Sequence, residues 1–184
     1  MPHTEPRPQE AVQPRRPTPV TYLITFACYG AHVHGDESPS VDRKHNIAGT
    51  RMLEPNFGRA FAERRSMDQL PYSMDRPHRD AVLASIVERS LRRGWSLIAA
   101  HVRSNHVHVI IDADVAPERI MNDLKSYASR FLNQAGFDTP GRKRWARHGS
   151  TRWLRDRVNV DAAIRYVTEK QGDPMAIYVA AERL

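Results

Sequence analysis

The chain has 184 residues, of which 40% are hydrophobic, and its mean hydropathy is −0.61. These values predict one soluble domain, and no apolar run approaches the roughly 18 residues that a membrane-spanning helix needs. The formal net charge of +7 favours a polyanionic partner, with nucleic acid as the first candidate. The single cysteine, Cys28, excludes an internal disulfide framework and fits a reducing cytoplasm.

The N-terminal part of the chain changes character twice. Residues 1–19 contain six prolines and almost no apolar side chains, which predicts a disordered leader rather than a secretory signal. Residues 20–28 are rich in β-branched and aromatic side chains and predict a first strand. Residues 31–75 are polar and turn-rich, and we interpret them as a long insertion.

A helix and a β-hairpin are predicted next. Asp75 is a suitable N-cap, Pro77 lies in the first turn, and Gly94 suits a left-handed C-cap, with apolar residues at helical spacing between them. Residues 95–102 and the apolar run 107–111 predict two strands. The turn-like residues 103–105 would join these strands in a hairpin.

The C-terminal part supplies two more helices. Pro117 opens a helix to about residue 135, followed by a possible short strand at 150–155, a helix at 161–170 and a tail at 177–184. The order strand, helix, strand, strand, helix, strand, helix predicts an α+β fold. We expect a ferredoxin-like βαββαβ sandwich with an antiparallel sheet and an additional C-terminal helix, forming a single domain over residues 20–176.

The strand around residues 107–111 carries a histidine pair, His106 and His108. Residues two apart on a strand point to the same face, so the two imidazoles project side by side. Paired imidazoles are a common start of a metal site. On spacing alone, two unrelated histidines on a half-exposed strand is the more frequent situation.

Tyr127 is the candidate for chemistry on the helix that opens at Pro117. At about 100° per residue, Tyr127 lies on the flank of the apolar stripe, with Gln134, Asp123 and Arg130 on the same flank. It is either an amphipathic tyrosine at the core edge or a nucleophilic hydroxyl. The second interpretation requires His106 and His108 to face this helix.

The segment from Arg142 to Arg157 is strongly basic, and two tryptophans are interleaved in it. Arginine with aromatic side chains suits phosphate contact and base stacking, although a solvated basic face has the same composition. We predict DNA contact by Arg130, Arg142, Lys143, Arg144, Trp145, Arg147, His148, Arg152 and Trp153.

Several motifs together resemble the single-tyrosine HUH transposases, which are small insertion-sequence enzymes and their REP-associated relatives. The resemblance spans about residues 20–176. It rests on the run Asn105-His106-Val107-His108, the helix segment Leu124-Lys125-Ser126-Tyr127 with Asn133, Trp145 and His148, Ala163-Ile164-Arg165-Tyr166-Val167, Asp173-Pro174-Met175-Ala176, and the opening Tyr22-Leu23-Ile24-Thr25-Phe26 with Tyr29-Gly30.

This resemblance implies a metal-dependent attack of a tyrosine on single-stranded, hairpin-bearing DNA. Tyr127 would form a 5′-phosphotyrosine, and His106 and His108 would hold a divalent cation, Mg²⁺ or Mn²⁺. The family commonly has a polar third ligand one turn after the tyrosine, where this chain has Phe131. Gln134 is the substitute that helical geometry suggests, with Asp123 and Asn133 behind it, and His34, Asp36 or Glu37 in the insertion as further possibilities.

The expected protein is thus a DNA transposase that acts as a homodimer in the bacterial cytoplasm at the nucleoid. Two alternatives use the same fold. One is a domesticated nucleic-acid-binding protein whose chemistry was lost with Phe131. The other is a metal-dependent nuclease in which water is the nucleophile and Tyr127 is structural.

Overall fold

The computed structural model describes residues 20–31 and 65–181. This part of the chain contains, in order, β1 (Val20–Cys28), α2 (Arg76–Arg93), β2 (Ser96–Val102), β3 (His106–Ala113), α3 (Pro117–Gln134), β4 (Trp145–Leu154), α4 (Arg157–Glu169) and β5 (Ala176–Val179). The strands form one antiparallel sheet in the order β4-β1-β3-β2-β5. The predicted α+β, ferredoxin-like order is confirmed, and β5 adds a strand where the sequence suggested only the start of a tail.

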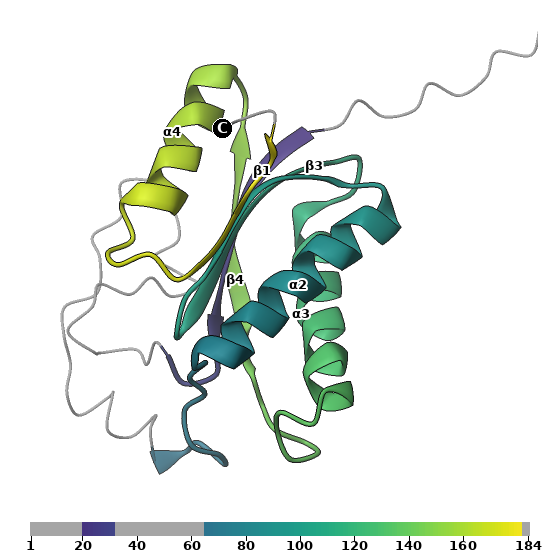
Figure 1. The fold of residues 1–184 in the computed structure, drawn as a ribbon, viewed down its shortest axis with the longest axis vertical. Helices are drawn as coiled ribbons and strands as arrows, with labels where there is room; N and C mark the ends of the chain where they lie inside the picture. The colour runs from purple at the N-terminus through teal and green to yellow at the C-terminus, as the bar shows by residue number, and fades with distance from the viewer. Residues whose placement is uncertain (1–19, 32–64, 182–184) are drawn as a thin grey trace, which may run out of the picture.

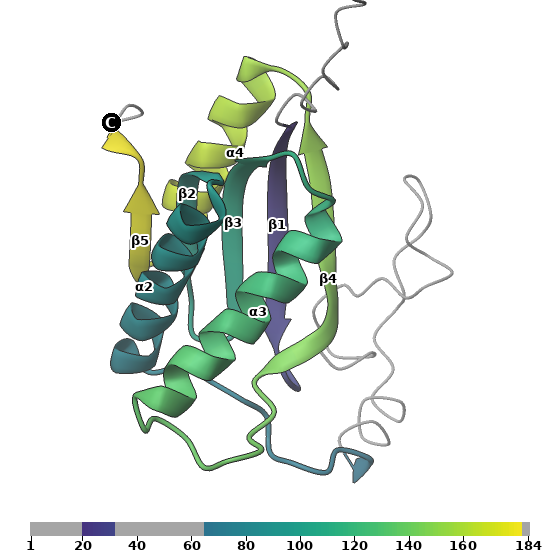
Figure 2. The ribbon, with the colours of Figure 1, turned by 90° about the vertical axis from the view of Figure 1, so that its right-hand side faces the viewer.

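The helices form two layers of unequal size on the sheet. α2 and α3 lie side by side on one face, and α4 alone covers part of the other (Figures 1 and 2). The larger core, beneath α2 and α3, includes Ile24, Val107 and Val109. The smaller core, beneath α4, includes Ile110, Ala163 and Val167. Odd and even residues of β3 therefore serve different layers.

Helix boundaries follow local capping. The Asp75 side chain accepts a hydrogen bond from the His78 backbone N–H at 3.0 Å, and Gly94 ends α2 with φ at 68°, as predicted. α4 begins at Arg157, earlier than the predicted residue 161, because the Asp156 side chain accepts from the Asn159 backbone N–H at 2.8 Å. This cap also shortens the connection between β4 and α4 to two residues.

Lys125 is a buried cation that ties β4 to α3. Its side chain is only 6% exposed, and Nζ donates to the backbone oxygens of Ala146 at 3.0 Å and His148 at 3.1 Å. The Trp145 indole N–H donates in return to the Lys125 backbone oxygen at 3.0 Å. β4 is an edge strand, so these contacts fix a segment that has a neighbouring strand on one side only.

Replacing Lys125 with methionine should change the pH dependence of the free energy of unfolding. Burial lowers the pKa of the Lys125 amine from 10.5 to about 8. The folded chain thus loses this proton near pH 8, whereas the unfolded chain keeps it to about pH 10.5. Between these pH values the unfolded state binds more protons than the folded state. The free energy of unfolding of the wild type should therefore rise with increasing pH relative to that of Lys125→Met. Urea unfolding of both proteins at pH 7 and about pH 10 measures this difference, and a pH-independent difference would contradict it.

Within residues 20–31 and 65–181, no helix has both the length and the apolarity that crossing a membrane requires. The predicted leader and most of the predicted insertion, with His34, Asp36 and Glu37, lie outside the described residues.

Candidate active site

His106 and His108 lie side by side on β3, as predicted. Their ring centroids are 4.7 Å apart, and His108 is only 4% exposed. In the register of β1 against β3, Thr25 lies opposite His108 and Ala27 lies opposite His106. All four residues line one pocket of about 400 Å³ on the α4 side of the sheet. The imidazoles therefore face an open pocket on the α4 side of the sheet.

Hydrogen bonds hold both imidazoles by their Nδ1 atoms. His106 Nδ1 donates to the Asn105 side-chain oxygen at 2.7 Å, which leaves the lone pair on Nε2. His108 Nδ1 lies 2.7 Å from Thr25 Oγ1, and its Nε2 lies 3.1 Å from Gln171 Oε1. The Gln171 oxygen can only accept, so His108 Nε2 donates to it and Nδ1 accepts from the Thr25 hydroxyl. Because a hydroxyl can also accept, Thr25 supports the other neutral tautomer of His108 as well, with its lone pair on Nε2. Partners at Nδ1 are the usual way in which a protein orients metal-binding histidines.

His108 is electrostatically suited to remain neutral. Burial and the neighbouring His106 imidazole lower its pKa from 6.5 to about 4, while the hydrogen bond that its Nε2 donates to the Gln171 side-chain oxygen acts in the opposite direction. A neutral imidazole has the lone pair that a cation requires. The local environment thus favours the protonation state that binds metal.

The donor atoms around the pocket fit a divalent cation only if an amide oxygen takes part. Among the described residues, no group of three or more His, Cys, Asp or Glu side chains is placed to hold a metal ion. Gln171 supplies the third polar atom, because its Oε1 lies 3.1 Å from His108 Nε2. Two imidazole nitrogens and an amide oxygen suit Mn²⁺ or Mg²⁺ when water or phosphate oxygens complete the shell.

Tyr166 on α4 is the tyrosine beside the histidine pair. Its ring centroid lies 5.6 Å from that of His108, and the side chain is 44% exposed. Tyr166 lines the same pocket as His106, His108 and Gln171. Its phenol is therefore accessible to a bound substrate and lies in the same pocket as both imidazoles.

The terminal part of α4 is held in place by His101, a residue that the sequence analysis did not single out. His101 is fully buried; its Nδ1 donates to the Val167 backbone oxygen at 2.7 Å, and the Met175 backbone N–H approaches its Nε2 at 3.3 Å. In the β2–β3 register His101 lies opposite His108. It therefore fixes the chain on both sides of Gln171 relative to the histidine pair.

The position of Tyr127 requires a correction. This residue lies on α3, half-buried, with the Arg89 guanidinium 4.9 Å and the Arg130 guanidinium 5.8 Å from its ring centroid. α3 packs on the face of the sheet opposite to α4 (Figure 2), whereas the histidine pocket lies on the α4 face. The condition that His106 and His108 face this helix is therefore not met within the chain.

The predicted third ligand, Gln134, and the substitutes Asp123 and Asn133 also lie on α3, away from the histidine pocket. Gln134 is exposed at the C-terminal end of α3. Asp123 is paired with Arg89 and Arg93 at 2.6 Å each, and the Asn133 side chain accepts from Arg144. Gln171 is not among the residues predicted from the sequence, although it lies just after the end of the helix that carries Tyr166.

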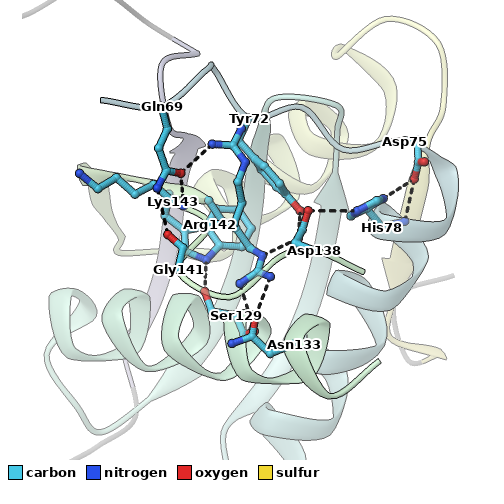
Figure 3. A network of polar contacts seen from close by, with 12 residues as sticks. Gln69, Tyr72, Asp75, His78, Ser129, Asn133, Asp138, Gly141, Arg142 and Lys143 are labelled. Atoms are coloured by element: carbon cyan, nitrogen blue, oxygen red, sulfur yellow. Dashed lines mark hydrogen bonds and ion pairs between the residues drawn. The ribbon is translucent and has the colours of Figure 1, made fainter. Parts of the chain in front are cut away.

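The basic segment divides into structural and accessible parts. Arg144 is only 4% exposed; it pairs with Asp138 at 2.7 Å and donates to Asn133 at 2.8 Å (Figure 3). Arg142 donates to Gln69 and to two backbone oxygens in the 68–75 segment, and Lys143 pairs with Asp68. The Trp145 ring packs edge-on against Phe26 at 5.2 Å. These four predicted DNA contacts have structural partners in the fold.

The accessible members of the predicted DNA-binding set occupy more than one face. Arg130, Arg147, His148, Arg152 and Trp153 are exposed. His148 lines the histidine pocket, and Arg152 lines a neighbouring cavity on the same face. Trp153 follows Arg152 on β4, so it projects to the other face of the sheet. His148 and Arg152 are thus the basic residues next to the candidate site.

The described residues define an α+β, ferredoxin-like domain in which paired imidazoles on a central strand lie beside a tyrosine. A family model described as "Transposase IS200 like" matches residues 72–170, which is more than half of the chain. The protein therefore belongs to the IS200-like transposase family. The matched segment includes β3 with the histidine pair and α4 with Tyr166.

Other comparisons are more distant. No curated protein matches the chain. Among solved structures, the fold is similar to that of a REP-associated tyrosine transposase bound to a REP hairpin, with a TM-score of 0.45 and 10% sequence identity. That similarity covers 88% of this chain and 72% of the other.

Proposed function

We propose that this transposase cleaves and rejoins single-stranded DNA through a covalent bond to Tyr166, with a divalent cation held by His106, His108 and Gln171. The observation that carries the proposal is that these four side chains line or border one pocket on the α4 face. Membership of a transposase family and the net charge of +7 support DNA as the substrate.

The proposed reaction is a transesterification. The cation, when bound, would stabilise negative charge on the scissile phosphate. Tyr166 Oη loses its proton to solvent and forms a bond to phosphorus, while the bond from phosphorus to the 3′-oxygen breaks. That oxygen takes up a proton and leaves as a 3′-hydroxyl, and the downstream strand stays attached to Tyr166 through its 5′-phosphate. A 3′-hydroxyl can later reverse these steps, so rejoining needs no external energy source.

Three further side chains in or beside the pocket have supporting tasks in this scheme. Asn105 and Thr25 orient the imidazoles through their Nδ1 atoms. His148, exposed at the pocket edge, is placed to contact a DNA phosphate. Joining two strand ends requires two such sites, which a homodimer of this chain would supply. Phe131 lies on α3, away from the pocket, so its lack of a ligand atom is no argument for lost chemistry.

Detection of a covalent adduct tests the proposal. We expect wild-type protein, incubated with Mn²⁺ and labelled single-stranded oligonucleotides that contain hairpins, to give an SDS-resistant protein–DNA band. Chelation with EDTA before mixing should abolish the band. Cleavage without an adduct would overturn the covalent mechanism in favour of attack by water. DNA binding with neither cleavage nor adduct would instead leave a nucleic-acid-binding protein.

A further inference from the structure

A second pocket lies directly beside the candidate active site. It has a volume of about 340 Å³ and shares Thr25, Ser150 and Tyr166 with the histidine pocket. Its other lining residues come from β1, β4 and α4 and include Leu23, Arg152 and Ala162. Tyr166 thus borders two cavities, of which only one contains the histidine pair.

We propose that this second pocket binds the nucleotide immediately downstream of the scissile phosphate, the one that remains attached to Tyr166. The inference rests on the proposed function, because it assumes the covalent bond to Tyr166 Oη. The phosphate itself must lie on the histidine side of Tyr166, where a cation could contact it. The attached nucleotide is one phosphate group away from the phenol, and the second pocket is directly next to it because Tyr166 lines this pocket too.

The lining of the second pocket matches the chemistry of a nucleotide. Leu23, Ala162 and Ala163 form an apolar surface against which a base or deoxyribose can pack. The Arg152 guanidinium is exposed, and no carboxylate among the described residues pairs with it, so it is available to a phosphate.

Asn159 supplies a directional polar group at the same pocket. Its side-chain N–H donates to Asp156 at 2.7 Å, and its backbone N–H donates to the other oxygen of that carboxylate at 2.8 Å. These two bonds hold the amide in place and leave its carbonyl oxygen as an acceptor for a base edge. The pocket therefore combines an apolar surface, the Arg152 guanidinium and the fixed Asn159 carbonyl oxygen. This combination allows it to prefer some bases over others.

Filling the pocket tests its role. Ala162 is exposed on α4, so the larger side chain of Ala162→Leu fills part of the pocket without disturbing a core. Ala84 is an exposed alanine of α2 in the other helix layer, and Ala84→Leu is the matched control. The probe is a pool of single-stranded oligonucleotides with a randomised segment, and both the covalently attached and the released strands are sequenced after reaction with Mn²⁺.

We expect Ala162→Leu to lower the adduct yield about tenfold, comparable to the loss of one base-stacking contact. It should also change the base preference at the first nucleotide of the attached strand, with the released strand unaffected. Ala84→Leu should match the wild type. Arg152→Gln, as a second variant, should reduce the salt dependence of DNA binding by about one phosphate contact.

The possible failures are distinguishable. Wild-type adducts with unchanged yield and base preference in Ala162→Leu would overturn the subsite and leave the proposed function intact. A change confined to the last nucleotide of the released strand would assign the pocket to the other side of the cleavage site and overturn this inference. Absence of any adduct with wild-type protein would overturn the proposed function and, with it, the subsite.

Discussion

Tyr166→Phe is expected to reduce covalent adduct formation by about a thousandfold or more, because it removes the only proposed nucleophilic atom and leaves the ring in place. Tyr166 lines the pocket that contains His106 and His108, and its ring lies 5.6 Å from that of His108. The loss of one hydroxyl should leave the fold and DNA binding unchanged. Denaturing gels with labelled single-stranded DNA and Mn²⁺ measure the adduct.

Tyr127→Phe is the matched control for this prediction. Tyr127 also lies on a helix and is partly exposed, but it contacts Arg89 and Arg130 on the opposite side of the sheet. We expect its adduct yield to stay within about twofold of the wild type, since the ring that the arginines contact is retained. The reverse outcome, with the adduct lost in Tyr127→Phe and kept in Tyr166→Phe, would assign the nucleophile to α3.

His108→Ala is expected to weaken Mn²⁺ binding by more than about 100-fold and to abolish the adduct. The substitution removes one of two imidazoles whose centroids are 4.7 Å apart. DNA binding should persist with its salt dependence, because the proposed phosphate contacts are made by other residues. Calorimetric titration with MnCl₂ measures the metal, and filter binding at several salt concentrations measures the DNA.

His148→Ala provides the control for the metal measurement. His148 lines the same pocket, but among the described residues no three potential His, Cys, Asp or Glu ligands converge on one point. We therefore expect Mn²⁺ affinity to remain at the wild-type value in His148→Ala. Equal Mn²⁺ affinity in His108→Ala and the wild type would contradict the assignment of the histidine pair as ligands.

The sequence predicts much of the scaffold because its signals are local. The caps Asp75 and Gly94, the strand periodicity around His106 and His108, and the apolar stripe of α3 each lie within a few residues of the element that they define. The predicted common face of the two histidines follows from strand geometry alone. β5 and the full length of β4 were missed, because both are edge strands whose pairing is not apparent from their composition.

The expected position of Tyr127 beside the histidine pair was wrong for a different reason. It depended on which face of β3 is covered by α3, and that is a property of the whole topology. One signal was present: Val107 and Val109 are the more apolar set of β3 and lie in the larger core under α2 and α3. His106 and His108 must then face the other layer, where α4 carries Tyr166.

The structural roles of Arg142 and Arg144 could not be predicted from the sequence either. Their partners, Gln69 and Asp138, come from separate loops, and a run of basic residues gives no indication of which side chains are already paired. A basic segment can therefore join two loops in one part and remain accessible to DNA in another. Here Arg142 and Arg144 bind the loops, whereas Arg147, His148 and Arg152 are exposed.

The division of the helices into unequal layers has a consequence for the order in which the native state loosens. α4 rests on the smaller core, whereas β3 is paired on both sides and contributes to both cores. Segments that bury fewer apolar contacts open at a lower free energy than the rest of a domain. Partial opening would thus release Tyr166 while His106 and His108 remain in the sheet, so the proposed DNA-cleaving activity would be lost at a milder stress than the fold itself.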